Sequence, residues 1–317
     1  MRLLLWCIGV GLLAFLVGST LMTTANPEVT FWGDVRDRRD AELEQIRTEN
    51  PGDPVIIFAG GSSCAFSIRP EIIRKVTGLP AMNYGVAAGS GSKYIIEQAL
   101  RRCEKGDILV LALEPHFLLE PGRGKPTRLG MSLAVADRDI SLAVGGDTFE
   151  DSVTPGQFFE YLRPGARYAA TYLGKALKGD LTYRYNPKDY RPCGWLETSY
   201  RVPALEAVEN AHGTHISDEG RQLLKMSKQE AEKKGVTIFY SLPWIFTNKS
   251  VVNEARRSHV ILLKDIAQTI PVLNDKTYGS QPNINYFSDS SYHLDANGAS
   301  MRSEIVGESL LNVLHEK

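Results

Sequence analysis

The chain has few cysteines and no excess of charge of either sign. Its 317 residues include four cysteines and no Cys-x-x-Cys pair, which excludes a disulfide scaffold and a cysteine-rich zinc module. The 36 Lys and Arg residues against 37 Asp and Glu give a formal net charge of −1, so there is no electrostatic argument for a nucleic-acid partner. A hydrophobic content of 43% is that of a folded protein, not of a disordered chain.

Nucleotide-binding and metal-binding motifs are also missing. The glycine-rich segments match neither a Walker A loop, which ends in Gly-Lys-Ser/Thr, nor a Rossmann fingerprint on the first predicted strand. His212 and His215 form a His-x-x-His pair, but two ligands are too few for a zinc site. We therefore expect neither a cofactor nor a metal.

One long apolar run stands out from this average composition. Residues 3–22 carry no charge, and as a helix they would span about 30 Å, the thickness of a bilayer core. Residues 23–25 are small enough for cleavage, so residues 1–25 are either a transmembrane anchor or a removed signal segment. Arg2 before the run and Glu28 after it favour an inside amino terminus. We expect a single-pass cell-membrane protein with its domain in the periplasm or at the cell surface, or a secreted protein after cleavage.

The rest of the chain divides into a charged segment and an α/β domain. Residues 26–50 carry charges of both signs and predict a solvated juxtamembrane helix or linker. From 51 to 317, short apolar runs alternate with helical patterns, which predicts a three-layer α/β/α domain with a parallel, flavodoxin-like sheet. An insertion at about 115–215, with a predicted helix at about 157–178, interrupts the alternation. The strands are expected at 55–59, 81–86, 107–113, 237–242 and 270–273, and the helices at 70–77, 93–103, 218–234, 253–268 and 297–314.

Two loops at the expected carboxyl edge of the sheet could carry chemistry, since ligands of open α/β sheets bind there. Gly60-Gly61-Ser62-Ser63 follows the first strand and would expose a serine at a helix start, although an ordinary N-capped turn has the same residues. Gly85 and Gly89 follow the second strand. Either glycine can offer its backbone amide to an oxyanion, or simply permit close packing.

A third candidate lies just before the last predicted helix. His293 is a candidate general base, and Asp289 can hold its imidazole in the useful tautomer. A lone histidine near a helix start can also be purely structural. The order along the chain, with the serine turn first, the glycine loop second and the Asp–His pair last, is rare in α/β proteins and favours a catalytic interpretation.

These three blocks resemble the SGNH/GDSL hydrolase superfamily. The matching stretches are VIIFAGGSSCAFSI at 55–68, MNYGVAAGSG at 82–91 and FSDSSYHLDANGA at 287–299. The resemblance covers about 54–113 and 235–314. It is closest to membrane-anchored members that act in bacterial envelope polymer acylation, such as the D-alanyl-lipoteichoic acid biosynthesis protein family.

The resemblance implies a role for each matching residue. Ser62 looks like the nucleophile because Gly60-Gly61-Ser62 with Phe66 and Ile68 repeats the family's spacing, and Ser63 is the alternative if the register shifts by one. The implied roles of the others are the oxyanion amide for Gly89, a second oxyanion amide for Gly85, the base for His293 and its acidic partner for Asp289.

The chain departs from the family pattern at two places. Leu113-Glu114-Pro115-His116 stands where the family has Gly-x-Asn-Asp, so the asparagine that would complete the oxyanion hole is missing. We expect Glu114, His116 and Ser63 to contribute to substrate binding instead. Asp289 also lies four residues before His293, where three is usual, and Asp295 remains a substitute.

The predicted function is that of an extracytoplasmic serine esterase or O-acyltransferase acting on acyl esters of cell-envelope glycans. The implied partners are an envelope glycan or another acyl ester, the membrane through the N-terminal helix, and a membrane-bound acyltransferase. The alternative is a catalytically weak or inactive protein of the same fold that serves binding or assembly in envelope polysaccharide export. The missing asparagine favours that alternative. The Tyr-rich stretch 182–190 and Trp195 either stack on sugar rings or are ordinary, partly buried aromatics.

Overall fold

The computed structural model confirms an α/β fold with a parallel central sheet. It describes residues 1–24, 26–122, 125–144, 174, 177–179, 183–198, 200–202, 204–208, 213–273 and 275–315. The predicted helix at about 157–178 lies almost wholly outside these residues. Five strands form the sheet in the order β2-β1-β3-β4-β6, and each neighbouring pair is parallel. They are β1 (Ile56–Gly60), β2 (Ala81–Asn83), β3 (Ile108–Ala112), β4 (Thr237–Ser241) and β6 (Val272–Leu273).

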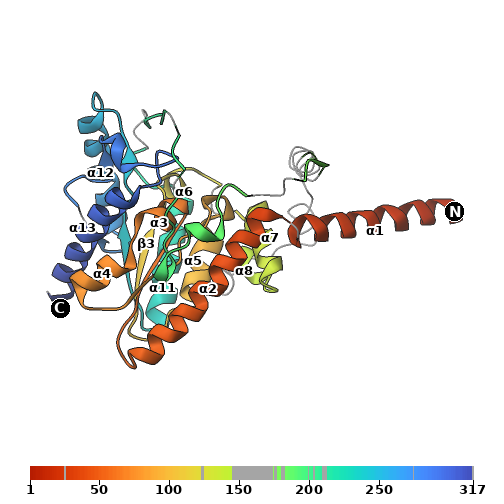
Figure 1. Cartoon of the computed structure of the whole chain (residues 1–317), viewed down its shortest axis with the longest axis horizontal. Helices are drawn as coiled ribbons and strands as arrows, with labels where there is room; N and C mark the ends of the chain where they lie inside the picture. The colour runs from red at the N-terminus through yellow and green to blue at the C-terminus, as the bar shows by residue number, and fades with distance from the viewer. Residues whose placement is uncertain are drawn as a thin grey trace.

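Helices cover both faces of this sheet, as a parallel sheet requires. Alternate strand residues such as Ile57 and Leu109 pack with α5 (Ser92–Leu100), α11 (Asp218–Lys233) and α12 (Val252–Ala267). The opposite strand residues, such as Phe58 and Val110, form a second core with two further helices. Those helices are α4 (Pro70–Thr77) and α13 (Ala296–His315), which lie side by side at the left of Figure 1.

Several short elements surround the sheet. A parallel pair of strands, not expected from the sequence, consists of only two residues in each strand. That pair is β5 (Ile245–Phe246) and β7 (Ser280–Gln281). The other short elements are α3 (Ser62–Ser67), η1 (Ala88–Ser90), α6 (His116–Leu119), α7 (Arg128–Ala136), α8 (Ser141–Val144), η2 (Pro187–Asp189), η3 (Pro192–Gly194) and η4 (Ile284–Tyr286).

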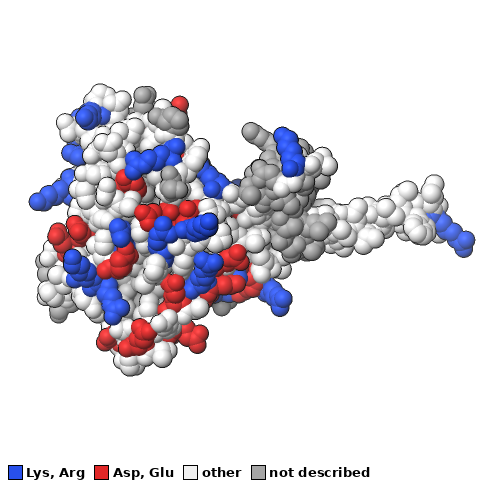
Figure 2. All heavy atoms as spheres, viewed as in Figure 1, with Lys and Arg blue, Asp and Glu red and all other residues white. Residues whose placement is uncertain are grey.

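The apolar N-terminal run forms the helix α1 (Arg2–Thr24). It projects from the domain in Figure 1, and most of its large apolar side chains are exposed. In Figure 2 it is uncharged along its length except for the cation at its tip. By length and composition α1 can cross a membrane, and a signal sequence would meet the same criteria.

The charged segment is a helix, α2 (Pro27–Glu49), but the expectation that it is solvated is wrong. Asn26 caps its first turn by accepting a hydrogen bond from the Glu28 amide at 3.0 Å. One face packs on the domain because its apolar residues recur every three or four positions, a stripe that the surrounding charges conceal in the sequence. The side chains buried on this face are Val29, Phe31, Trp32, Val35, Arg39, Leu43 and Ile46.

Arg39 joins α2 to the domain through buried hydrogen bonds. Its guanidinium donates to the carbonyl oxygens of Gly85, at 2.6 Å from Nη1, and Gly194, at 3.0 Å from Nε. Burial lowers the pKa of Arg39 from its ordinary value. The charge is tolerated because backbone carbonyls satisfy the donors, so α2 is a structural part of the domain that follows it.

Replacing Arg39 by methionine is expected to lower the free energy of unfolding by about 2–6 kcal/mol. Two buried carbonyl groups would lose their donors, and each unpaired group costs about 1–3 kcal/mol. Urea unfolding of the full chain in detergent, followed by tryptophan fluorescence, measures the change. The control is Arg38→Met, at an exposed position, where about 0.5 kcal/mol or less is expected. Equal losses in the two variants would contradict the role assigned to Arg39.

Candidate active site

Ser62 is the first residue of α3, directly after β1 at the carboxyl edge of the sheet. The turn before it is tight, because a Cβ on Gly60 would come within 2.2 Å of the Ala112 carbonyl oxygen on β3. Ser62 is half-buried, whereas Ser63 is fully buried at 0% exposure. Of the two serines, only Ser62 offers a hydroxyl to a ligand from outside, which favours it as the nucleophile.

Asp289 and His293 form a direct pair in the loop before α13. The Asp289 Oδ1 and His293 Nδ1 atoms are 2.8 Å apart. Since a carboxylate only accepts, this contact assigns the proton to Nδ1 and leaves Nε2 as the basic nitrogen. The loop accommodates the four-residue spacing by closing on itself, with the Ser288 amide donating to the His293 carbonyl at 2.9 Å.

Two residues of the insertion hold the other oxygen of Asp289. The Tyr185 hydroxyl donates to Oδ2 at 2.8 Å, and an Arg184 Nη2 atom lies 2.9 Å from the same oxygen. Burial by itself would raise the pKa of Asp289, but its contacts with His293, Tyr185 and Arg184 lower it below its ordinary value. Asp289 is therefore an ionised partner for the imidazole at neutral pH.

Sequence reasoning missed Arg184 and Tyr185. They lie in the Tyr-rich stretch, more than 100 positions before Asp289, and no spacing rule connects the two segments. The only signal in the sequence was an arginine between two tyrosines, a combination suited to binding a carboxylate.

The Asp–His loop is seated on the same short helix that begins with Ser62. The His293 ring stacks on Phe66 with the ring centroids 4.5 Å apart and the planes at 23°. Phe66 follows Ser62 by four residues, so the two side chains lie on one face of α3, one turn apart. His293 is thus seated on the helix that Ser62 begins, although in the described part of the chain no hydrogen bond joins Ser62 to His293.

The two candidate oxyanion glycines differ in availability. The Gly85 amide donates to the Asn83 side-chain oxygen at 2.8 Å, and a Cβ on Gly85 would lie 2.3 Å from the Ala65 nitrogen. Gly85 is thus a packing glycine, and its engaged amide disfavours it as an oxyanion donor. Gly89 is exposed in η1. The backbone hydrogen bonds of that turn are donated by the amides of the next two residues, Ser90 and Gly91. Gly89 therefore remains the candidate oxyanion donor of the two glycines.

Glu114 lies beneath the serine turn, not on the surface where a substrate would bind. Its Oε1 accepts a hydrogen bond from the Ser63 amide at 3.0 Å, and the residue is only 2% exposed. A Cβ on Gly61 would come within 2.3 Å of both carboxyl oxygens, so any larger residue there would displace the Glu114 carboxyl. Among the described residues, neither Glu114 Oε2 nor Ser63 Oγ has a hydrogen-bond partner. Glu114 and Ser63 therefore support the turn, and substrate contact through them is not favoured.

Substituting glutamine for Glu114 is expected to raise the free energy of unfolding at pH 8, because it removes a carboxyl whose ionised form is disfavoured by burial. Burial raises the pKa of Glu114, partly opposed by its contact with the Ser63 amide. A carboxyl whose folded pKa exceeds its unfolded pKa loses stability as pH rises from the unfolded value through the folded one. Glu114→Gln removes this loss, since the amide oxygen can still accept from Ser63.

Urea unfolding of the full chain between pH 4 and 8 tests this prediction. The range begins near the ordinary pKa of a carboxyl group and extends above it. The matched control is Glu97→Gln, because Glu97 is buried but paired with Arg101 Nε at 2.8 Å. That variant is expected to lose stability. A pH profile of Glu114→Gln that parallels the wild-type profile would contradict the prediction.

Two further candidate residues, Asp295 and His116, have other contacts. Asp295 accepts from the Gly298 amide at 2.8 Å and pairs with Arg201, so it caps α13 and does not replace Asp289. His116 opens α6 and packs against Phe117, with ring centroids 4.3 Å apart.

The structure also shows the surroundings of the His-x-x-His pair, of Trp195 and of the cysteines. His215 is exposed, and its partner in the sequence pair, His212, lies outside the described residues. Where the structure describes the chain, no cluster of three or more metal-ligating side chains occurs. Trp195 is buried beneath the Arg69 guanidinium, as an ordinary core aromatic. All four cysteines are free thiols, including Cys103 and Cys193.

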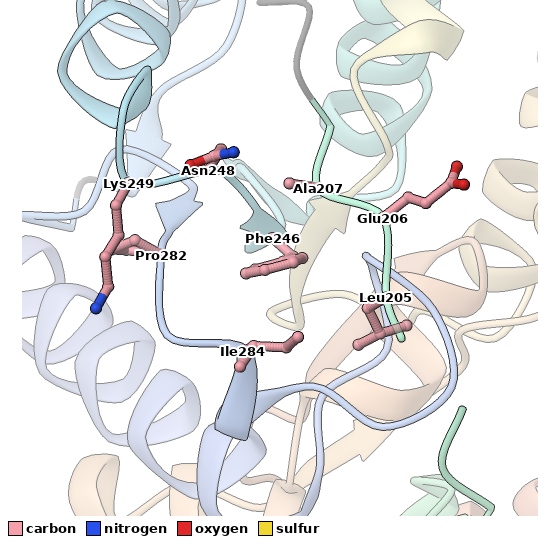
Figure 3. Close-up of a pocket in the computed structure, with 8 residues that line it drawn as sticks. All are labelled: Leu205, Glu206, Ala207, Phe246, Asn248, Lys249, Pro282 and Ile284. Atoms are coloured by element: carbon pink, nitrogen blue, oxygen red, sulfur yellow. The ribbon is translucent and has the colours of Figure 1, made fainter. Parts of the chain in front are cut away.

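A separate cavity of about 720 Å³ adjoins the Asp–His loop. In Figure 3 the Phe246 ring lies between Leu205 and Ala207 on one side and Pro282 and Ile284 on the other, with Lys249 at the rim. The Phe246 amide donates to the Ser291 carbonyl at 2.8 Å, which connects this cavity to the loop. None of the predicted site residues lines it.

Comparisons with known proteins do not identify a family for this chain. No protein-family model matches the chain, and no curated protein matches it. One solved structure that aligns with it is a Salmonella typhimurium LT2 protein provisionally described as sugar binding. The two are 11% identical over 88% of this chain and 98% of the other, with a TM-score of 0.16. A likeness of that size carries no argument about fold or function.

Proposed function

We propose that the protein is a membrane-tethered serine esterase or O-acyltransferase of the SGNH type, acting outside the cytoplasm. The observation that carries the proposal is the Asp289–His293 pair, 2.8 Å apart, stacked on the helix that presents Ser62. A nucleophile, a base and a group that orients the base are the three parts required for acyl transfer through an acyl-enzyme.

In the proposed reaction the Ser62 hydroxyl attacks the carbonyl carbon of an ester. His293 Nε2 accepts the hydroxyl proton, and the ionised Asp289 stabilises the imidazolium through Nδ1. The Gly89 and Ser62 amides are the candidate donors to the oxyanion. Collapse of the tetrahedral intermediate expels the alcohol, which takes the proton from His293. Water or a sugar hydroxyl then attacks the acyl-enzyme, losing its proton to His293, and Ser62 is regenerated.

The proposed substrate is an acyl ester on an envelope glycan, or one supplied by a membrane-bound acyltransferase. The support is α1, which is long and apolar enough to hold the domain at a membrane. A reporter active only outside the cytoplasm, fused to the carboxyl terminus, tests the side of the membrane. Activity of the reporter is expected, and a cytoplasmic signal would reject the extracytoplasmic placement.

A fluorophosphonate probe tests the chemistry directly. The full chain in detergent should form one covalent adduct, and peptide mass spectrometry should locate it on Ser62. His293→Ala should slow labelling by about 10³-fold or more, because the serine then lacks its base. Failure of the folded protein to label would reject the proposal.

The second candidate function is a binding or assembly protein that has kept the fold without efficient catalysis. The specific observation in its favour is Glu114, which lies where the family has an oxyanion-hole asparagine and whose carboxyl is directed at the Ser63 amide. Losing one oxyanion donor costs about 3 kcal/mol of transition-state stabilisation. A labelled Ser62 would eliminate this candidate, because probe reaction requires an activated nucleophile.

A further inference from the structure

Three consecutive residues of the insertion connect α2 with the Asp–His pair. The Tyr183 hydroxyl donates to Glu28 Oε1, in the first turn of α2, at 3.0 Å. Arg184 pairs with Asp289 Oδ2 and also donates to the Asp289 backbone carbonyl at 3.2 Å. The Tyr185 hydroxyl donates to Asp289 Oδ2. Residues 183–185, here called the brace, therefore contact the juxtamembrane helix at one end and the candidate site at the other.

Aromatic packing makes the brace continuous with both neighbours. Phe31 of α2 lies against Tyr183 and Tyr185, with ring centroids 5.3 and 6.2 Å apart. Tyr185 in turn lies 4.8 Å from Phe66, the ring on which His293 stacks. Phe31 and Phe66 are both buried, and buried aromatic contacts of this kind restrict ring movement. The position of Tyr185 thus depends on α2 as well as on α3.

The hydroxyl of Tyr185 bears on the tautomer of His293. It lies 3.2 Å from His293 Nδ1 as well as 2.8 Å from Asp289 Oδ2. When Nδ1 carries the proton, the hydroxyl hydrogen is directed to Asp289, and the carboxylate is fixed with Oδ1 toward the ring. Without that bond the carboxylate can rotate, and His293 can adopt the Nε2–H tautomer, which cannot accept a proton from serine.

We propose that Tyr185 is a positioning residue for the Asp289–His293 pair, held in place by Phe31 of α2 directly and by Glu28 through Tyr183. The helix that follows the membrane anchor is then part of the catalytic assembly, not only a connection to it. This inference takes its catalytic meaning from the proposed function, but the histidine tautomer can be measured whether or not the protein is an esterase.

The test compares Tyr185→Phe with Tyr84→Phe in the full chain in detergent. Tyr84 is the matched control, because its hydroxyl also donates to an aspartate, Asp40 of α2, at 2.8 Å, and not to the Asp289–His293 pair. Nitrogen-15 NMR of labelled histidine, with His293→Ala to assign the signals, reports the tautomer. Tyr185→Phe should increase the Nε2–H share of His293 and lower kcat on a p-nitrophenyl ester by about tenfold with little change in KM. Tyr84→Phe should change neither.

Variants of the α2 contacts test the second half of the proposal. Tyr183→Phe and Phe31→Leu should shift the His293 tautomer in the same direction by a smaller amount. An unchanged tautomer in Tyr185→Phe, or an equal change in Tyr84→Phe, would overturn the positioning role. An unchanged tautomer in both α2-contact variants would overturn the part assigned to α2. A tautomer shift in a protein with no esterase activity would uphold the positioning role and reject the proposed function.

Discussion

Replacing Ser62 by alanine is expected to lower turnover of a p-nitrophenyl ester by about 10⁵- to 10⁶-fold. Without the hydroxyl no acyl-enzyme forms, and only binding and oxyanion stabilisation remain to assist direct attack by water. Steady-state kinetics on the full chain in detergent measures the loss. The Ser62→Ala/His293→Ala double variant should be no slower than Ser62→Ala, because residues that act as a unit are not additive.

Ser63→Ala is the matched control, since it deletes the same hydroxyl at the next position. Ser63 Oγ is buried and, within the described part of the chain, makes no hydrogen bond. Its removal should leave turnover within about tenfold of the wild type, because deleting an unpaired buried hydroxyl exposes no other group. The reverse result, an inactive Ser63→Ala and an active Ser62→Ala, would assign the nucleophile to Ser63.

Asp289→Asn is expected to lower turnover by about 10⁴-fold, the effect of the same substitution in a serine-protease triad. An asparagine amide facing His293 favours the imidazole tautomer that lacks a basic Nε2. The stability profile should change as well. The pKa of Asp289 is lowered in the folded state, so its contribution to stability is present above the unfolded pKa and is lost as pH falls through the folded one. Asp289→Asn should remove that acid-dependent part.

Asp265→Asn is the control that separates the effect of Asp289→Asn on turnover from its effect on stability. Asp265 is also buried, pairs with Arg221 at 2.8 Å and accepts from the Ile216 amide at 2.9 Å. Its pKa is likewise lowered, with Arg221 and the Ile216 amide opposing the effect of burial. The variant should lose stability in the same pH range while keeping wild-type turnover per folded molecule. A loss of turnover equal to that of Asp289→Asn would show that general destabilisation, not the tautomer, explains both.

Much of the fold can be predicted because its signals are local. The apolar runs at β1, β3 and β4 and the helical patterns at α4, α11, α12 and α13 agree with the structure to within a few residues at their ends. A buried strand and an amphipathic helix each have a sequence period of their own, whatever they pack against. The helix α2 was misjudged, because its abundant charges concealed the stripe that includes Phe31 and Arg39.

Only part of the candidate site can likewise be predicted from local sequence. Ser62, after β1, and the Asp289–His293 pair, before α13, can be proposed from motif and order alone. The direction of backbone groups cannot be predicted in this way, so the engaged amide of Gly85 and the placement of Glu114 under the turn became evident only in three dimensions.

The sequence alone determined that an apolar segment precedes an α/β domain with a serine turn and a late Asp–His pair, since each of these is encoded within a few neighbouring residues. Tertiary structure decided which groups surround the pair. Tyr185 lies 104 positions from Asp289, and Arg39 lies 46 from Gly85. Contacts over such separations depend on how the whole chain packs, and no local pattern of polarity specifies them. Few cysteines and balanced charge excluded several classes of protein, but only packing shows that α2 contacts Tyr183 and Tyr185, next to the Asp289–His293 pair.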